Sequence, residues 1–291
     1  MNYIVFDLEW NQPANEAATV KTPVYLTGEI IEIGAVKLDE AFRPTDELRL
    51  YILPQYYTKM HKRIAALTAI RDKALAAEGI PFPEAYAKFI AWCGSPCAFM
   101  TWSMNDVPML IDNMRLHGID ASELPECYDI QRIFSRELLR TDTRSSLDAA
   151  LALLKEKGDP AHDALHDARN TVKICNHLDL AEYLCEYASK VFLLPPDEKT
   201  YANRADVLSD PALTTYRCPW CGAAVQCEPW VLQENNTYIA YGLCPEEDEF
   251  LLRLTLCKHP PKEYHVKRLL FEMSDDLWDI YMDKKETQPP T

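Results

Sequence analysis

The segment Tyr3-Ile-Val-Phe-Asp-Leu-Glu-Trp10 decides the fold that this chain of 291 residues is expected to take. Its first four residues are apolar and rich in β-branched and aromatic side chains, which predicts a short buried strand. Asp7 and Glu9 follow, two residues apart. Because successive side chains of a strand point to opposite faces, both carboxylates are expected on one face at the strand's end. Taken alone, such a pair more often marks a solvated strand edge than a cation site.

Strands and helices are expected in a defined order after this segment. Strands are expected at residues 29–38, 47–53 and 97–102 and near residue 128. Helices are expected at residues 62–77, 82–92 and 105–117 and from residues 131, 146 and 162 onward, with Asn105 as a candidate N-cap. Three strands followed by alternating helices and strands predict an α/β domain, a mixed sheet flanked by helices, over residues 1–189.

The pattern changes after residue 189. Residues 190–213 contain several prolines and little apolar periodicity, so we expect a linker there. Residues 214–291 are expected to form a small all-β domain, with strands at 237–243, 250–256 and 264–271 and a last helix from Ser274 to Lys284.

The cysteines of this second domain suggest a zinc site. Cys218-Pro-Trp-Cys221-Gly has the spacing of a zinc knuckle, but after Cys244 a glutamate stands where a second ligand of the pair is expected. The expected ligands of a structural Zn²⁺ are Cys218, Cys221, Cys244 and Cys257, with Cys227 and His259 as other candidates. We therefore expect a zinc-ribbon-like domain, with a metal-free ribbon as the alternative.

Two further acidic residues lie at predicted helix starts. Asp106 follows a buried strand, where side chains reach a crevice, although an acid at a helix start also simply complements the helix dipole. In the helix opened by residues 162–171, Asp167 lies at the edge of the apolar stripe and His166 on the opposite, wet side. His162 stands at the mouth of this helix. That stripe consists of Leu165, Ala168, Val172 and Cys175.

These residues together resemble the DEDDh exonucleases, the DnaQ-like and RNase T-like 3′ to 5′ enzymes. The resemblance rests on Asp7-x-Glu9, Glu29-Ile-Ile-Glu-Ile-Gly-Ala-Val, Leu67-Thr-Ala-Ile, Trp102-x-x-x-Asp106 and His162-x-x-x-x-Asp167-Ala. It covers about the first 185 residues, and several spaced motifs are far more specific than one. Ala69 departs from the family, which commonly has Gly there, and residues 12–27 form a longer stretch than in many relatives.

The resemblance implies a ribonuclease-H-like fold and a metal-dependent 3′ to 5′ exonuclease acting on single-stranded nucleic acid. Asp7, Glu9, Asp106 and Asp167 would then hold two Mg²⁺ or Mn²⁺ ions, and His162 would be the general base. It further implies that Leu8 and Trp10 surround the 3′ nucleotide. Trp10 and Trp102 are candidates for stacking on bases, with a place in the core as the alternative for each.

The Trp102-x-x-x-Asp106 form slightly favours RNA over DNA, and relatives are often homodimers. The formal net charge of -15 argues against a protein that coats a duplex, although cations bound by a carboxylate site would offset part of it. No apolar run is long enough to span a bilayer and no basic segment opens the chain, so we expect a cytoplasmic protein. The alternative function is a catalytically silent nucleic-acid-binding or scaffold protein that contacts partners through the zinc-ribbon-like domain.

Overall fold

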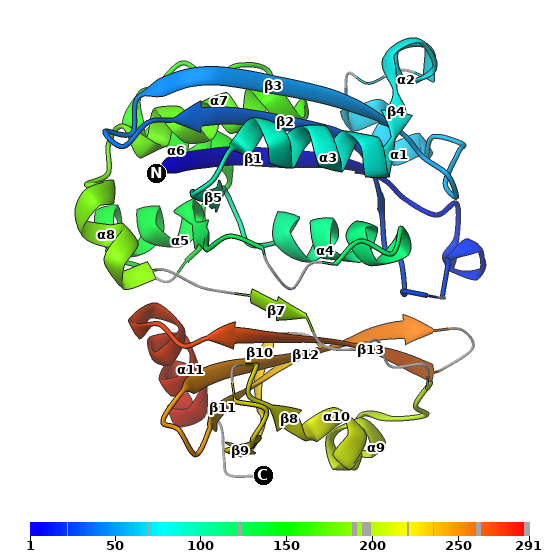
Figure 1. Ribbon diagram of the computed structural model, residues 1–291, viewed down its shortest axis with the longest axis vertical. Coiled ribbons are helices and arrows are strands. Elements are labelled where there is room, and N and C mark those ends of the chain that lie inside the picture. Colours follow the sequence, from blue (N-terminus) through cyan, green and yellow to red (C-terminus); the bar gives the residue numbers. More distant parts are fainter. Residues whose placement is uncertain are drawn as a thin grey trace. The chain divides into compact units, whose positions relative to one another are not determined.

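The computed structural model describes residues 1–291 except 22, 69, 71, 121–123, 142, 188–190, 194–198, 220, 235, 260–262 and 288–291. The chain divides into two compact units (Figure 1). Unit 1 comprises residues 1–120 and 125–187, and unit 2 comprises residues 121–124 and 188–291.

Unit 1 is built on a mixed sheet in the order β4-β3-β2-β1-β5-β6. Its strands are β1 Asn2–Asn11, β2 Glu29–Leu38, β3 Pro44–Leu53, β4 Ile80–Pro81, β5 Cys97–Thr101 and β6 Cys127–Asp129. β1 to β3 pair antiparallel, whereas β5 runs parallel to β1 and β6 parallel to β5. The predicted mixed α/β sheet is confirmed.

Helices cover both faces of this sheet (Figure 1). They are α1 Lys62–Leu67, α2 Asp72–Glu78, α3 Phe82–Cys93, α4 Asp106–Leu116, α5 Ile130–Ile133, α6 Leu147–Leu154, α7 Ala164–Cys175 and α8 Leu180–Tyr187. A short 3₁₀ turn spans Glu16–Ala18, and Phe134–Leu138 continues α5 as one π-helical turn. Within the described residues, no helix is both long enough and apolar enough to cross a bilayer.

Two expectations about these helices were wrong in detail. The stretch 62–77, expected as one helix, contains α1 and α2, and α1 ends at Thr68, whose backbone is extended. Asn105 precedes α4 in a helical backbone conformation and its side chain makes no capping hydrogen bond. By contrast, Ser146 caps α6 by accepting a hydrogen bond from the amide of Ala149 at 3.2 Å, as its residue type favours.

The core of unit 1 fixes which face of the sheet carries the acids. The Phe6 ring of β1 packs against Phe89 of α3 and Phe99 of β5, at centroid distances of 5.7 and 5.1 Å. Asp7 is the next residue of β1 and therefore faces the other side of the sheet. Helix α7 packs against β1 and β2 on that side, because the stripe predicted on it is buried.

Unit 2 contains a second sheet in the order β7-β13-β12-β11-β9-β8, with β10 paired to β11. The strands are β7 Val191–Leu193, β8 Tyr216–Arg217, β9 Ala224–Cys227, β10 Val231–Glu234, β11 Thr237–Leu243, β12 Glu249–His259 and β13 Glu263–Glu272. The last helix is α11 Asp275–Thr287, and the Ser274 hydroxyl accepts a hydrogen bond from the amide of Leu277 at 3.4 Å.

The stretch 190–213, expected to be a linker, contributes folded elements to unit 2. β7 pairs with β13, and the stretch from residue 204 onward forms α9 Arg204–Ser209 and begins α10 Pro211–Thr214. Val207 and Leu213 are fully buried against residues of β12 and β13. These elements are only three to six residues long, too short to show a clear apolar periodicity in the sequence. Residues 194–198 lie outside the described part of the chain.

Candidate active site

Asp7 and Glu9 project from the carboxyl-terminal half of β1, and both side chains are partly exposed. The antiparallel ladder places Asp7 opposite Gly34 and Glu9 opposite Glu32, and a bulge follows between Glu9 and Trp10. Since residues paired across a ladder share a face, Asp7 and Glu9 both lie under α7. The strand alternation thus places the two acids as the sequence predicted.

Asp106 reaches the same strand from the first turn of α4. β5 runs parallel to β1 and ends at Thr101, so the chain re-enters a helix beside the end of β1. The Asp106 Oδ1 atom accepts a hydrogen bond of 3.1 Å from the backbone amide of Leu8. Asp106 is only 5% exposed, and this hydrogen bond fixes its carboxylate at the backbone of the residue that separates Asp7 from Glu9.

Asp167 and His162 complete the cluster from α7 and the loop before it. The His162 backbone amide donates a hydrogen bond to Asp167 Oδ2 at 3.0 Å. One side-chain ligand atom from each of Glu9, His162 and Asp167 lies within 4.8 Å of the other two. Asp167 Oδ1 is buried and has no hydrogen-bond partner. The side chains from three distant stretches therefore meet at one point on the sheet.

The crowding of these acids changes their proton affinity. Burial raises the pKa of Asp7 well above its ordinary value, and the charges of Asp106, Asp167 and Glu9 raise it further. Burial, followed by the charge of Asp167, raises the pKa of Glu9 to about 8. Burial likewise raises the pKa of Asp106 to about 7, although the amide of Leu8 opposes the shift. Because the carboxylates repel one another when ionised, a bound cation or proton would stabilise this site.

Oxygen donors of this kind suit hard divalent cations, and the unpaired Asp167 oxygen leaves a donor free for one. The family model for exonucleases of the RNase T type matches residues 4–175, which include all five residues of the cluster. The chain belongs to this exonuclease family. A search of curated proteins found no match.

Solved structures support the same fold for this exonuclease. Cell-death related nuclease 4 is 18% identical, with a TM-score of 0.51. The match covers 62% of this chain and 64% of that chain. A 3′-exonuclease in a structure of histone mRNA stem-loop recognition is 17% identical, with a TM-score of 0.54 over 66% of this chain and 87% of that chain. A full-length 3′-exonuclease is 18% identical, with a TM-score of 0.53 over 64% of this chain and 84% of that chain.

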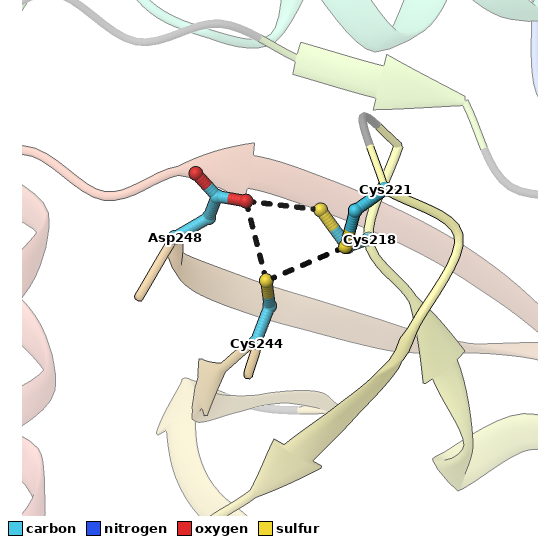
Figure 2. Close-up of side chains that lie close together, drawn as sticks. All are labelled: Cys218, Cys221, Cys244 and Asp248. Carbon is cyan, nitrogen blue, oxygen red and sulfur yellow. Dashed lines mark hydrogen bonds between the residues drawn. The ribbon is translucent and has the colours of Figure 1, made fainter. Parts of the chain in front are cut away.

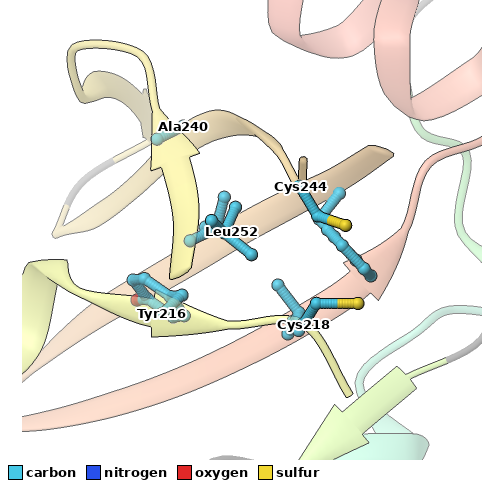
Figure 3. Packing of buried hydrophobic residues seen from close by; sticks show 8 residues of the cluster. Tyr216, Cys218, Ala240, Cys244 and Leu252 are labelled. Carbon is cyan, nitrogen blue, oxygen red and sulfur yellow. The ribbon is translucent and has the colours of Figure 1, made fainter. Parts of the chain in front are cut away.

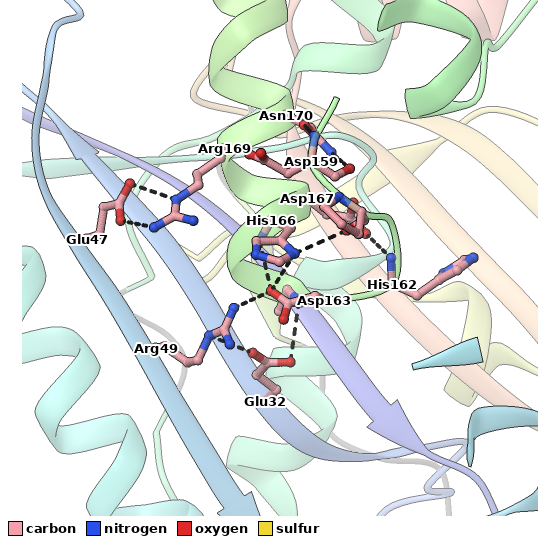
Figure 4. Close-up of polar contacts among 12 residues, drawn as sticks. Glu32, Glu47, Arg49, Asp159, His162, Asp163, His166, Asp167, Arg169 and Asn170 are labelled. Atoms are coloured by element: carbon pink, nitrogen blue, oxygen red, sulfur yellow. Dashed lines mark hydrogen bonds and ion pairs between the residues drawn. The ribbon is translucent and has the colours of Figure 1, made fainter. Parts of the chain in front are cut away.

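The start of α7 in this exonuclease is fixed by an ionic network that the sequence analysis missed (Figure 4). Arg49 of β3 forms an ion pair with Glu32 of β2, with 3.2 Å between Nε and Oε1. The same guanidinium also forms an ion pair with Asp163. Glu32 Oε2 accepts a hydrogen bond of 3.4 Å from the amide of Ala164, and Asp163 Oδ1 accepts one of 3.0 Å from the amide of His166. These bonds cap α7 and tie it to the sheet. The signal available in the sequence was a charged residue, Glu32, inside an otherwise apolar strand.

The loop that carries His162 is also held by its neighbours. Asp159 exchanges two hydrogen bonds with the buried Asn170 side chain of α7, at 2.8 and 3.1 Å. His162 has a left-handed backbone with φ +64°, and its side chain is exposed. His166 stays outside the cluster, where its Nδ1 atom lies 3.3 Å from the carbonyl oxygen of Pro160. Thus His162, and not His166, lies at the acids.

The expected substrate residues differ in accessibility. Leu8 and Trp102 are 3% and 8% exposed, and the Trp102 ring packs 5.7 Å from that of Phe134. Both therefore contribute to the core. Trp10 is partly exposed and its ring rests on Gly28, where an added Cβ would meet the ring at 2.3 Å.

The expected zinc ligands separate into two groups. Cys218, Cys221 and Cys244 lie together, and their fourth neighbour is Asp248. Cys257 lies opposite His265 in the β12–β13 ladder and is not part of this group, so its assignment as a ligand was wrong. Cys227 on β9 donates to the Val225 carbonyl instead.

Proposed function

We propose that this protein is a metal-dependent 3′ to 5′ exonuclease of the DEDDh type that hydrolyses single-stranded ends, with RNA slightly favoured over DNA. The observation that carries the proposal is the convergence of Asp7, Glu9, Asp106 and Asp167 with His162 beside them. Membership of the exonuclease family provides the chemistry, phosphodiester hydrolysis, to which this arrangement is suited.

The four carboxylates are the proposed ligands of two Mg²⁺ or Mn²⁺ ions. When bound, such ions lower the pKa of a water molecule and stabilise the negative charge that develops on the phosphate and the leaving oxygen. The residues themselves provide the template. Asp106 accepts a hydrogen bond from the Leu8 amide and Asp167 accepts one from the His162 amide, so the backbone helps to orient both carboxylates.

His162 is the proposed general base. An imidazole is the side chain that most often acts as a general base, and the exposed position of His162 would let it reach the attacking water and pass the proton on to solvent. The hydrogen bond from the His162 backbone amide to Asp167 holds the loop, and a ring nitrogen of His162 lies within 4.8 Å of a carboxylate oxygen of Glu9 and of Asp167. Glu9, which lies within 4.8 Å of Asp167 and His162, is proposed to contact the terminal 3′ hydroxyl as well.

Direction and substrate class rest on weaker support. Two of the similar structures are described as 3′-exonucleases, and one of them recognises the 3′ end of an RNA stem-loop. Trp10 lies next to the acids and is partly exposed, so we propose that it stacks on the terminal base. Stacking on an aromatic ring does not discriminate between bases. The formal charge of -15 predicts weak binding to duplexes and a grip limited to a few terminal nucleotides.

The proposal is tested with RNA and DNA oligonucleotides labelled at either end and incubated with Mn²⁺ or EDTA. We expect a 5′-labelled RNA to shorten stepwise, a 3′-labelled RNA to release its label first as a mononucleotide, and EDTA to stop both. Shortening from the 5′ end would contradict the direction, and faster hydrolysis of DNA would contradict the sugar preference. Binding without hydrolysis in Mn²⁺ would favour the alternative, a catalytically silent nucleic-acid-binding protein.

A further inference from the structure

Three cysteines and an aspartate of unit 2 lie together (Figure 2). Asp248 Oδ2 is 3.2 Å from the sulfur of Cys218 and 3.2 Å from that of Cys244, and the sulfurs of Cys221 and Cys244 are 3.7 Å apart. Ligand atoms of all four residues lie within 4.8 Å of one another. No step of the proposed nuclease reaction uses this group.

The four residues occupy two tight turns. The first connects β8 to β9, where the amide of Gly222 donates to the Cys218 carbonyl at 2.9 Å and Gly222 has φ +72°. The second connects β11 to β12, where the amide of Glu247 donates to the Cys244 carbonyl at 3.0 Å and Glu247 has φ +68°. Each turn begins at a cysteine and contains a residue with a left-handed backbone. Each turn also provides two side chains that can bind a metal, Cys218 and Cys221 in the first turn and Cys244 and Asp248 in the second.

Sheet pairing brings these turns to the same place. β9 pairs with β11 through Cys227 with Gly242 and Gln226 with Leu243, immediately beside the two turns. The amide of Glu246 also donates to the Cys244 sulfur at 3.2 Å, which stabilises negative charge on that sulfur. The donors are therefore assembled by backbone geometry before any ion binds.

The separations are close to those of a tetrahedral zinc centre, with the two sulfur–oxygen distances of 3.2 Å somewhat shorter. With Zn–S bonds of about 2.3 Å and a Zn–O bond of about 2.1 Å, tetrahedral ligands lie about 3.8 Å apart between sulfurs and about 3.6 Å apart between sulfur and oxygen. We infer that Cys218, Cys221, Cys244 and Asp248 form a structural Zn²⁺ site. Four protein ligands leave no position for a substrate, so the site is structural and not catalytic.

Asp248 takes the place that the sequence pattern assigned to Cys257. Cys257 lies eight residues beyond Glu249 along β12, a path of about 26 Å at about 3.3 Å per residue. A cysteine at that distance cannot share an ion with Cys244. The second turn, Cys244-Pro-Glu-Glu-Asp248, thus acts as a knuckle in which a carboxylate replaces the second thiolate.

The site adjoins the hydrophobic core of unit 2 (Figure 3). Cys218 and Cys244 are each 2% exposed and belong to the buried cluster that includes Tyr216, Ala240 and Leu252. A bound ion would tie the β8–β9 turn to the β11–β12 turn above this cluster. Metal binding would therefore contribute directly to the folding stability of unit 2.

The first test measures the metal in the full-length protein, purified without chelator after expression with zinc. We expect one zinc per chain by elemental analysis, and Co²⁺ replacing it should give the visible spectrum of a tetrahedral thiolate complex. Removal of zinc should lower the melting temperature of the protein, and Zn²⁺ alone should restore it. Protein that contains no zinc and binds no Co²⁺ overturns the site, as does a disulfide between Cys221 and Cys244 detected by mass spectrometry under non-reducing conditions.

The second test assigns the fourth ligand by comparing Asp248→Ala, Asp248→Cys and Cys257→Ser. Asp248→Ala should weaken zinc affinity by more than roughly 10-fold, since loss of even an outer-shell partner costs about that much. Asp248→Cys should keep the zinc and increase the thiolate-to-cobalt charge-transfer absorption, which shows binding even if the alanine variant fails to fold. Cys257→Ser is the matched control and should keep one zinc per chain. Loss of zinc in Cys257→Ser, with retention in Asp248→Ala, would reverse the assignment.

Discussion

Gly34 lies directly opposite Asp7 in the β1–β2 ladder, and the first turn of α7 rests on its α-carbon. A Cβ added there would lie 2.0 Å from the Leu165 amide nitrogen and 2.1 Å from the Ala164 carbonyl carbon. The absence of a side chain at Gly34 thus lets the backbone of α7 approach the strand that carries Asp7. Because Asp167 lies in the first turn of α7, the distance between this helix and the sheet determines the distance between Asp167 and the acids of β1.

Gly34→Ala should therefore impair both catalysis and folding. The helix backbone must shift, and a misplacement of about 1 Å can cost about 100-fold in rate. We expect kcat/KM to fall by about that factor, with a loss of about 1–3 kcal/mol in the free energy of unfolding from overpacking. Gly118→Ala is the control, because Gly118 has φ +66° but nothing within 4 Å, so it should lose stability and keep activity. Equal activity of Gly34→Ala and the wild type would show that the contact does not position Asp167.

His162→Ala should retain metal and substrate binding but lose roughly 100-fold or more in turnover, the usual effect of removing a general base. The loop should stay in place because its tie to Asp167 uses the backbone amide. Single-turnover hydrolysis of a labelled oligonucleotide measures the rate, and His166→Ala is the matched control. A normal rate in His162→Ala would remove this residue from the mechanism.

Asp7→Ala and Asp167→Asn should abolish hydrolysis even under saturating Mn²⁺, because each removes a proposed ligand. Glu47→Gln is the control. Glu47 lies outside the cluster, and its Oε1 atom accepts a hydrogen bond of 2.9 Å from Arg169 Nε. This variant should hydrolyse the substrate normally. Hydrolysis is followed over a range of Mn²⁺ concentrations. Rescue of either cluster variant by more Mn²⁺ would mean that its carboxylate is not an essential ligand.

Stability without metal should decrease as the pH rises. The pKa of Glu9 is raised from 4.5 to about 8 and that of Asp106 from 3.8 to about 7, so the folded protein binds these protons more tightly than the unfolded chain. Their contribution is fully present below about pH 4 and is lost by about pH 8. In EDTA, the melting temperature should therefore fall across this range, and the increase caused by Mg²⁺ should be larger at pH 8 than at pH 5. Asp106→Asn should show a weaker dependence. If Mg²⁺ stabilised the protein equally at both pH values, the metal would not bind to the carboxylates whose pKa values are raised.

Local patterns predicted several elements of both units. The bounds of β2 and β11 agree with the expected ranges 29–38 and 237–243, because alternation and apolar runs determine them locally. The placement of Asp167 beside the buried stripe of α7 followed from helical periodicity alone.

The residues that the sequence did not reveal depend on contacts between distant segments. Arg49 meets Glu32 and Asp163 only because of the register between β2 and β3 and the packing of α7, which no local window contains. Asp248 is not revealed by the spacing of cysteines and histidines, because its ligand is a carboxylate. The late cysteines do not show by their spacing alone which of them meet, and β12 carries Cys257 away from Cys244.

The left-handed backbone of His162 has a consequence for how this enzyme can change. A residue with a Cβ at φ +64° gives up about 1–2 kcal/mol relative to a right-handed conformation, a penalty that glycine largely escapes. The position proposed to move the proton is thus also one where the chain tolerates conformational strain. Selection for thermal robustness and selection for turnover would favour different residues there.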